Sequence, residues 1–326
     1  MKLRTGAVVA ASAVLLLASA CSGTGQAPPA ASAGGGEGTY GYTFTVVTHG
    51  AAGDTFWDVV KKGAEQAGTD LGSTVTYRDS NGDPARQSQL IDAAINEQVD
   101  GLVVSMANPD ALRASIEKAV AAGIPVITIN SGQDRSTEFG ALAHVGQDEV
   151  IAGQGAGEQM AAAGVTKALC VIQEAGNIGL EQRCQGFAAG LGGQVENLQV
   201  ENSNPTGAQA TIRAKLQSDP TINGVLTLGP VIGAVAITAV EESGSTAQLA
   251  TFDLNGDVTQ AIADGRMLFA VDQQQYVQGY LPIVMLTLYK ANLNTIGGGQ
   301  PVLTGPGYVT QENAAQVQDL ATQGTR

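Results

Sequence analysis

From residue 43 onward the chain alternates short β-branched runs with longer segments in which apolar residues recur at helical spacing. The run Leu102–Val104 is apolar at every position, and Val126–Ile129 is apolar except for Thr128, which is typical of parallel strands covered by helices on both faces. The capping residues Asp83 and Asn204 stand directly before prolines, so a helix should begin at each of these points. The pattern predicts an α/β fold made of successive strand–helix units.

These units fall into two blocks with no obvious exposed linker between them. The first block has expected strands at residues 43–48, 74–78, 101–105 and 125–129, and the second at 167–173, 195–201, 224–228, 248–252 and 267–272. Two such blocks predict two doubly wound lobes that face each other. Right-handed crossovers bring the carboxyl ends of the strands to one edge of each sheet, so polar residues that follow strands are the binding-site candidates.

The first twenty residues have the features of an export signal. Lys2 and Arg4 precede an apolar stretch that is too short for a permanent transmembrane helix, and small residues then lead to Cys21. A cysteine in this place resembles the bacterial lipobox, in which the thiol is acylated, although Ala18 stands where that motif usually has Leu. The same residues also fit an ordinary cleavage site, which would give a free secreted protein.

We therefore expect a signal peptide at residues 1–20 and a lipid on Cys21. A flexible tether rich in Gly, Ala, Ser and Pro should cover residues 21–41, because it has too few large apolar side chains to offset its ordering entropy. The expected location is the outer face of the cell membrane, either periplasmic or on the cell surface. No apolar run after the signal approaches the length of a transmembrane helix.

The net charge of the chain argues against one class of partner. Removal of residues 1–20 leaves 14 basic against 30 acidic residues, a net charge of −16, which repels phosphate backbones and argues against a nucleic-acid partner.

Cys170 lies in a strand-like run and Cys184 near the start of the next helix. They could remain buried thiols, but we favour a disulfide in an exported protein, since a strand and its following helix pack side by side.

Motifs for catalysis or metal binding are missing from the sequence. The two histidines, His49 and His144, are far apart, and no H-E-x-x-H, C-x-x-C or G-x-S-x-G occurs. The segment Asp253–Asp257 is similar to a calcium loop, but its glycine is misplaced and no Glu occupies the twelfth position. Asp253 also lacks an evident carboxylate partner for acid–base catalysis. We expect a binding protein without metal or cofactor rather than an enzyme.

Five short motifs, each at an expected strand end or helix start, resemble those of the ribose/galactose-type periplasmic sugar-binding proteins of ABC transporters. They are Asp54–Trp57 before a helix, Pro125–Asn130, Arg183–Phe187 as R-x-x-G-F, Thr251–Asp253, and the run Gln273–Gln275. The resemblance extends from Thr43 to the C-terminus. It implies a type I fold in which two doubly wound parallel-sheet lobes are joined by a three-strand hinge. The implied lobes are residues 42–146 with 274–301, and residues 147–273 with 302–326.

The resemblance also implies the site. A sugar presents an apolar C–H face and a rim of hydroxyls, so flat aromatic rings and planar polar groups suit it. Gly229-Pro230 stands where many relatives have Asn-Asp, and Ser131 stands where many have Arg, which implies a different hydroxyl pattern or a larger ligand. His49 and Asn202 or Ser203 could compensate. The expected ligand-binding residues are His49, Asp54, Phe56, Trp57, Asn130, Arg183, Asn202, Asp253 and Gln273.

The function that follows is that of a monomeric, extracytoplasmic solute-binding receptor. It should deliver a monosaccharide or a related polyol or cyclitol to the membrane permease of an ABC importer. An alternative is a receptor for a sugar-like signal that feeds a sensor or chemotaxis system. A transcriptional regulator with the same fold would need an N-terminal helix-turn-helix, and here the export signal occupies that position.

Overall fold

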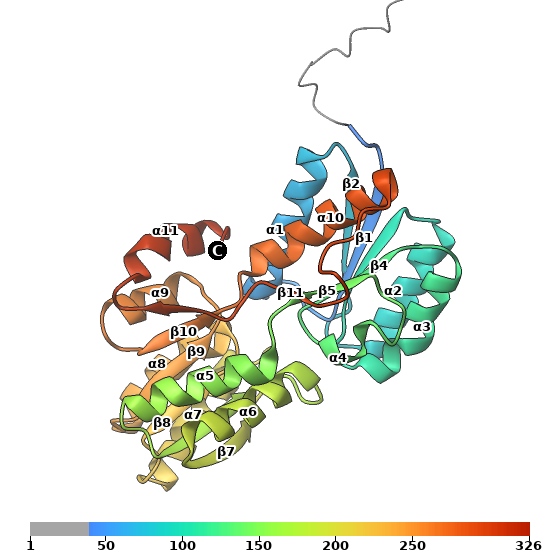
Figure 1. The fold of residues 1–326 in the computed structure, drawn as a ribbon. Helices are drawn as coiled ribbons and strands as arrows, with labels where there is room; N and C mark the ends of the chain where they lie inside the picture. Colours follow the sequence, from blue (N-terminus) through green and yellow to red (C-terminus); the bar gives the residue numbers. More distant parts are fainter. Residues whose placement is uncertain (1–38) are drawn as a thin grey trace, which may run out of the picture. The chain divides into compact units, whose positions relative to one another are not determined.

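The computed structural model describes residues 39–326 (Figure 1). The expected signal peptide, Cys21 and all but the last three residues of the expected tether lie outside the described residues. Within the described part of the chain, no helix has the length and apolar character needed to cross a membrane.

The first lobe is built on a six-stranded sheet in the order β11-β5-β4-β3-β1-β2, with every neighbouring pair parallel. Its strands are β1 (Thr43–Thr48), β2 (Thr74–Asp79), β3 (Gly101–Ser105), β4 (Val126–Ile129), β5 (Ala143–Gly146) and β11 (Val302–Leu303). Its helices are α1 (Thr55–Asp70), α2 (Pro84–Asn96), α3 (Pro109–Ala121), the short α4 (Gln133–Ser136) and α10 (Gln275–Asn292). Val46 packs with α1 and α10 on one face, whereas Val47 packs with α2 and α3 on the other.

The second lobe repeats this arrangement in the order β12-β10-β9-β8-β6-β7, with only β12 antiparallel to its neighbour. Its strands are β6 (Lys167–Ile172), β7 (Gln194–Gln199), β8 (Gly224–Thr227), β9 (Gln248–Phe252), β10 (Phe269–Asp272) and β12 (Gly307–Thr310). Its helices are α5 (Glu149–Ala162), α6 (Ile178–Leu191), α7 (Pro205–Ser218), α8 (Pro230–Ser243), α9 (Gly256–Ala263) and α11 (Ala314–Gln323). Apolar clusters cover both faces of this sheet as well. The predicted two-lobed α/β fold is confirmed.

The chain passes between the two sheets three times: from β5 to α5, from β10 to α10, and from β11 to β12. One expected boundary needs correction, because residues 302–303 were expected in the second lobe. Val302 pairs with Val145 in the first sheet, so the third crossing lies at residues 304–306. Thr304 holds this crossing, since its backbone N–H donates to the Gly146 carbonyl at 2.7 Å.

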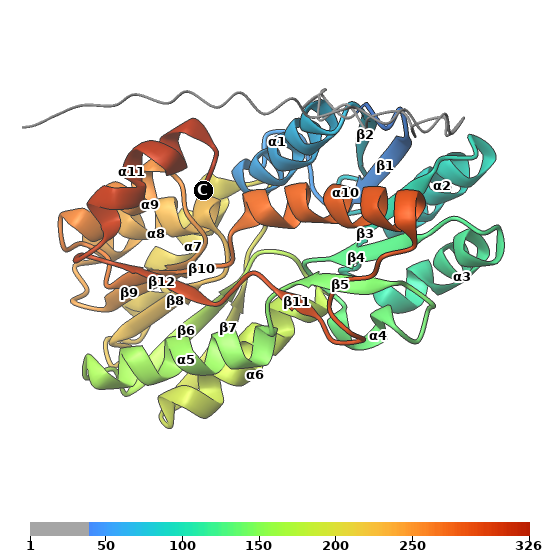
Figure 2. The same ribbon diagram turned by 45° about the horizontal axis from the view of Figure 1, so that its top comes forward.

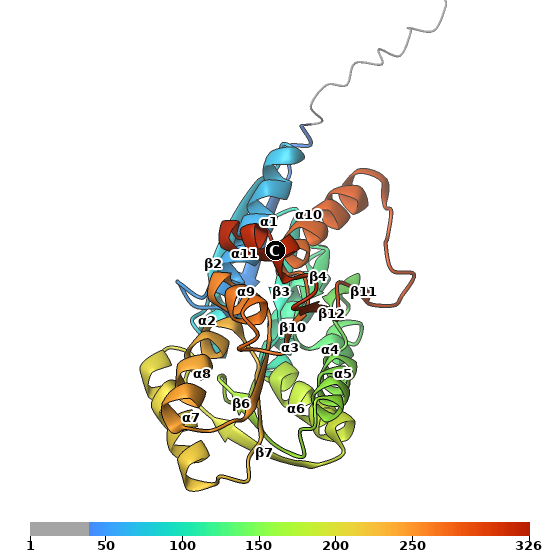
Figure 3. The same ribbon diagram turned by 90° about the vertical axis from the view of Figure 1, so that its left-hand side faces the viewer.

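Two helix pairs pack at unusually close range, and both involve helices that carry site residues (Figure 2). A Cβ at Gly153 of α5 would lie 2.1 Å from the Arg183 carbonyl oxygen of α6. A Cβ at Gly279 of α10 would lie 1.9 Å from the Val60 carbonyl oxygen of α1, and Figure 3 shows α1 and α10 alongside each other. Glycine therefore allows α5 to approach α6, and α10 to approach α1, closely enough for their backbones to touch.

A disulfide joins Cys170 of β6 to Cys184 of α6, with 5.8 Å between their Cα atoms. Both residues are buried in the apolar cluster between the second sheet and the pair α5–α6. The bond ties α6 to the strand before it, at the residue next to Arg183.

Candidate functional site

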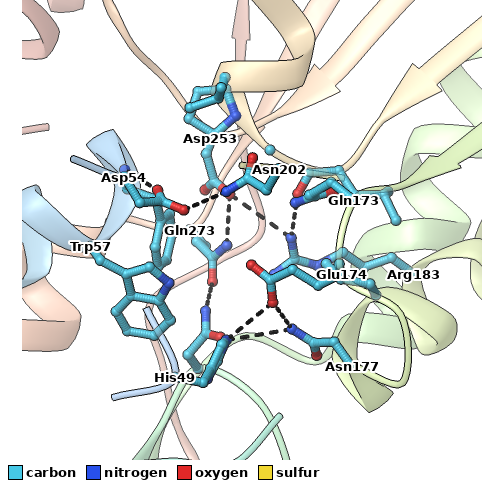
Figure 4. Close-up of a pocket in the computed structure, with 17 residues that line it drawn as sticks. His49, Asp54, Trp57, Gln173, Glu174, Asn177, Arg183, Asn202, Asp253 and Gln273 are labelled. Carbon is cyan, nitrogen blue, oxygen red and sulfur yellow. Dashed lines mark hydrogen bonds and ion pairs between the residues drawn. The ribbon is translucent and has the colours of Figure 1, made fainter. Parts of the chain in front are cut away.

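All nine residues expected at the ligand site line one cavity between the two lobes (Figure 4). About 390 Å³ of space lies between the side chains of its wall, and part of that space is open to solvent. The expected residues in its wall are His49, Asp54, Phe56, Trp57, Asn130, Arg183, Asn202, Asp253 and Gln273. Ser203, the other residue considered, lies instead in the wall of a larger outer compartment.

The first lobe supplies the aromatic side of the cavity. Asp54 caps α1, and its Oδ1 accepts a hydrogen bond from the Phe56 N–H at 3.0 Å. This cap fixes the first turn of α1, which presents Trp57 next to Phe56 with 4.9 Å between ring centroids. The His49 ring packs edge-on to Trp57 at 4.7 Å, and His49 Nδ1 is hydrogen-bonded to Ser105 Oγ at 2.7 Å. The rings are therefore held by a helix start and a strand end.

Two polar residues follow central strands in equivalent places, Asn130 after β4 and Asp253 after β9. Both adopt the left-handed backbone conformation, with φ of +62° and +66°. Asn and Asp tolerate this region better than other non-glycine residues, and such strain is often found at functional sites. Gln273 links them: its Oε1 accepts from Asn130 Nδ2 at 3.1 Å and its Nε2 donates to Asp253 Oδ2 at 2.9 Å. One side chain at the second crossing thus joins a strand end of each lobe.

Arg183 enters the cavity from α6 and is almost fully buried. Its Nε and one terminal nitrogen donate to the two carboxylate oxygens of Glu149 at 2.6 and 2.9 Å, and the other terminal nitrogen donates to the Leu228 carbonyl at 3.1 Å. The guanidinium also lies 4.5 Å from the centre of the Phe252 ring. Three of its five N–H donors are therefore occupied, and two remain for a ligand.

Glu149 was not anticipated from the sequence, although it is buried and begins α5 directly after the first crossing. Burial lowers the pKa of the Arg183 guanidinium, but the carboxylate of Glu149, with smaller contributions from Asp253 and Glu174, keeps the pKa raised. Glu149 and Arg183 can form this ion pair because α5 and α6 pack closely at Gly153. Sequence spacing holds no signal for such a contact between two helices.

The loop between β6 and α6 contributes three further residues that the motifs did not mark, Gln173, Glu174 and Asn177. Asn177 caps α6 by accepting from the Gly179 N–H at 3.0 Å, and its Nδ2 donates to Glu174 Oε2 at 2.7 Å. All three follow a strand of the second lobe, so the rule that ligands bind beyond strand ends could have found them. Leu180 and residues 228–231 complete the wall with mostly apolar groups.

The ionisable groups of the cavity titrate far from their usual ranges. Burial, helped by the charge of Arg183, lowers the pKa of His49 to about 3, so its ring is neutral. Its 3.6 Å approach to Glu174 is therefore not an ion pair at neutral pH. Burial raises the pKa of Asp253 to about 8, against the opposing effect of Arg183. Burial and then the charge of Glu174 raise the pKa of Asp54 to about 6.

The two lobes also contact each other directly around the cavity. Asn202 Nδ2 donates to Asp54 Oδ2 at 2.7 Å, and the Ile178 N–H donates to the Ala107 carbonyl at 3.0 Å. Ser131 does not reach the cavity wall; its hydroxyl lies 3.2 Å from the Asn177 side-chain oxygen. These contacts place the described residues in a closed arrangement, with the cavity between the lobes.

The site combines two aromatic rings with amides, carboxyls and one guanidinium, which suits recognition of a small polyhydroxylated molecule. Within residues 39–326, no group of three or more His, Cys, Asp and Glu side chains could hold a metal ion. The segment 253–257 is a strand end and helix start: Asp253 lines the cavity, and Asn255 caps α9 by accepting from the Val258 N–H.

Comparison with known proteins agrees with this geometry. A family model described as "Periplasmic binding protein domain" matches residues 44–292. The ribose import binding protein of Bacillus subtilis is 29% identical over 236 residues, which cover 69% of this chain and 74% of that protein. The xylose/arabinose-binding protein of Sulfolobus acidocaldarius is 26% identical over 68% of this chain, but the match spans only 60% of that protein.

Among solved structures, a carbohydrate transporter from Acidothermus cellulolyticus in complex with myo-inositol is similar to this chain. It has 43% sequence identity and a TM-score of 0.86, and the match covers 88% of this chain and all of that one. The TM-score shows that the two chains share the two-lobed fold. The chain belongs to the periplasmic binding protein family, as an extracytoplasmic sugar-type solute-binding protein of an ABC transporter and not an enzyme.

Proposed function

We propose that the ligand of this receptor is a cyclitol of the myo-inositol class. The observation that carries this proposal is the 43% identity to a structure that holds myo-inositol, together with the full length of that match. The cavity supports it, because polar side chains converge from both lobes and the aromatic rings of Phe56 and Trp57 form one side. An inositol carries a hydroxyl on every ring carbon, so it can use polar partners around its whole rim.

The ligand-binding residues of the proposed site are those expected from the sequence, with Gln173, Glu174 and Asn177 added. We propose that the lobes close on the ligand about the three crossings, as rigid bodies. Gln273 supports this proposal, because it lies at the second crossing and contacts Asn130 of one lobe and Asp253 of the other. The monomeric, lipid-anchored protein would then present the closed form to the permease of the importer.

A ligand screen tests the proposed class. The mature protein should melt several degrees higher with excess myo-inositol, because a ligand that binds only the native state adds about 4 kcal/mol at a thousandfold excess over Kd. Ribose, arabinose and glucose should raise the melting temperature less at the same concentration. Titration calorimetry then gives the affinities. A pentose or hexose that binds tighter than every cyclitol would contradict the proposal.

A separate experiment tests the lipid anchor at Cys21. We expect Cys21 to carry lipid, so the intact protein should sediment with membranes, whereas Cys21→Ala should be released or remain unprocessed. Several acyl chains hold a protein firmly to a membrane, while a single chain gives only marginal binding. Mass spectrometry of the N-terminal peptide from the membrane fraction decides the question. An unmodified Cys21 in that fraction would rule out the lipid anchor.

A further inference from the structure

The cavity has more acidic groups than its one cation can balance. Asp54, Glu174 and Asp253 line it, and Arg183 is the only Lys or Arg in its wall. The Arg183 guanidinium already donates two hydrogen bonds to Glu149, a residue that does not line the cavity. His49 is neutral and adds no positive charge. The guanidinium of Arg183 also lies 3.9 Å from Asp253 Oδ2, so Asp54 and Glu174 are the two carboxyl groups left without a matching cation among the residues of the wall.

The excess of acidic over basic residues is also found in the larger outer compartment. The larger outer compartment shares Asp54 and Glu174 with the cavity and adds Glu201, and no Lys or Arg lines it. The lining of both compartments therefore disfavours solutes with a carboxylate or phosphate group and favours solutes with a positive charge.

The hydrogen-bonding groups of the cavity wall are also unbalanced, because an acceptor there lacks a donor. One acceptor in the cavity wall, Gln173 Oε1, has no hydrogen-bond partner, although Gln173 is only 9% exposed. A buried acceptor without a donor is costly, so this atom requires a donor from the ligand. A hydroxyl supplies one donor, whereas an ammonium group of similar size supplies three. The unpartnered acceptor and the two uncompensated carboxyl groups point to the same kind of substituent.

From these two imbalances we propose that Asp54 and Glu174 form a subsite for an ammonium group, so that the cavity binds an amino-substituted cyclitol or sugar more tightly than its neutral parent. The inference rests on the proposed function and specifies one substituent of the ligand. Asp54 can offer its Oδ2, which also accepts a hydrogen bond from Asn202 Nδ2. Glu174 can offer its Oε1, since its Oε2 accepts from Asn177 Nδ2. Burial raises the pKa of Glu174 and of Asp54, as is expected where a counter-charge is missing.

The test compares matched pairs of ligands that differ by one group. Titration calorimetry measures myo-inositol against amino-deoxy-inositols, and glucose against glucosamine, with the mature protein at neutral pH. We expect the aminated member to bind at least tenfold tighter in the pair that fits the cavity, because a charge-assisted hydrogen bond is about twice as strong as a neutral one. If the glucose pair binds and the cyclitol pair does not, the proposed function fails, and the affinity ratio in the glucose pair still decides the inference.

Two substitutions locate the subsite. Glu174→Gln and Asp54→Asn should each lower the ratio of aminated to neutral affinity by about tenfold, and Asn keeps a cap on α1. Glu201→Gln is the control, since it removes one carboxylate from the outer compartment only, and the ratio should change less than twofold. The inference is overturned if aminated ligands bind no tighter than their parents, if they do not bind at all, or if Glu174→Gln weakens both members of a pair equally.

Discussion

Arg183→Ala should weaken ligand binding by more than about a hundredfold and lower the free energy of unfolding by about 3–5 kcal/mol. Two contributions combine in this effect. The ligand loses the two donors that remain on the guanidinium, and Glu149 becomes a buried carboxylate with no cation. The loss of stability distinguishes Arg183 from a cleft residue that touches only the ligand. Titration calorimetry gives the affinity, and urea unfolding of the ligand-free protein gives the stability.

The control for Arg183→Ala is Arg213→Ala. Arg213 also lies in the second lobe, and it contacts Glu242 at 2.7 Å, but both side chains are more than 40% exposed. An exposed ion pair contributes at most about 1 kcal/mol, and neither Arg213 nor Glu242 lines the cavity, so binding should not change. Equal loss of stability in the two variants would show that the buried pair does not support the fold as argued.

The sequence predicted those elements whose signal is local. The fully buried strands β3 and β4 and the helix starts at Pro84 and Pro205 lie where apolar runs and caps indicate. The strand-end rule and the resemblance together brought all nine expected residues to one cavity wall, because each one stands close to the end of a strand or the start of a helix. Local sequence thus determines which edge of each sheet carries the site.

What the sequence did not predict depends on contacts between distant segments. Glu149 pairs with Arg183 only because α5 and α6 touch at Gly153, and nothing in either helix alone indicates this partner. The two-residue strand β11 is too short to show a period, so the boundary near residue 301 was wrong. The raised pKa of Asp253 follows from burial between two lobes, which no local pattern reports.

Asp253→Asn should make the protein progressively more stable than the wild type as the pH rises from 5 to 8. In the unfolded chain this carboxyl titrates near 3.8, whereas in the folded protein burial raises its pKa to about 8. Between these values the folded state retains a proton that the unfolded state has released, so wild-type stability falls as the pH rises. Asn has no proton to lose, so the difference between the two proteins should grow by up to about 1.4 kcal/mol per pH unit.

The measurement is urea unfolding of both ligand-free proteins at pH 5, 6, 7 and 8, with the difference in unfolding free energy plotted against pH. His49 acts in the opposite direction below pH 6.5, because its pKa is lowered to about 3, but it is present in both proteins and cancels in the difference. Asp219→Asn is the matched control: a hydrogen bond from Lys167 lowers the pKa of Asp219 to about 2, so its stabilising contribution is lost only in acid. That variant should differ from the wild type by a constant amount above pH 5. If Asp253→Asn gave the same flat difference, Asp253 would be ionised in the folded protein, and a cavity with a neutral carboxyl beside Arg183 would be excluded.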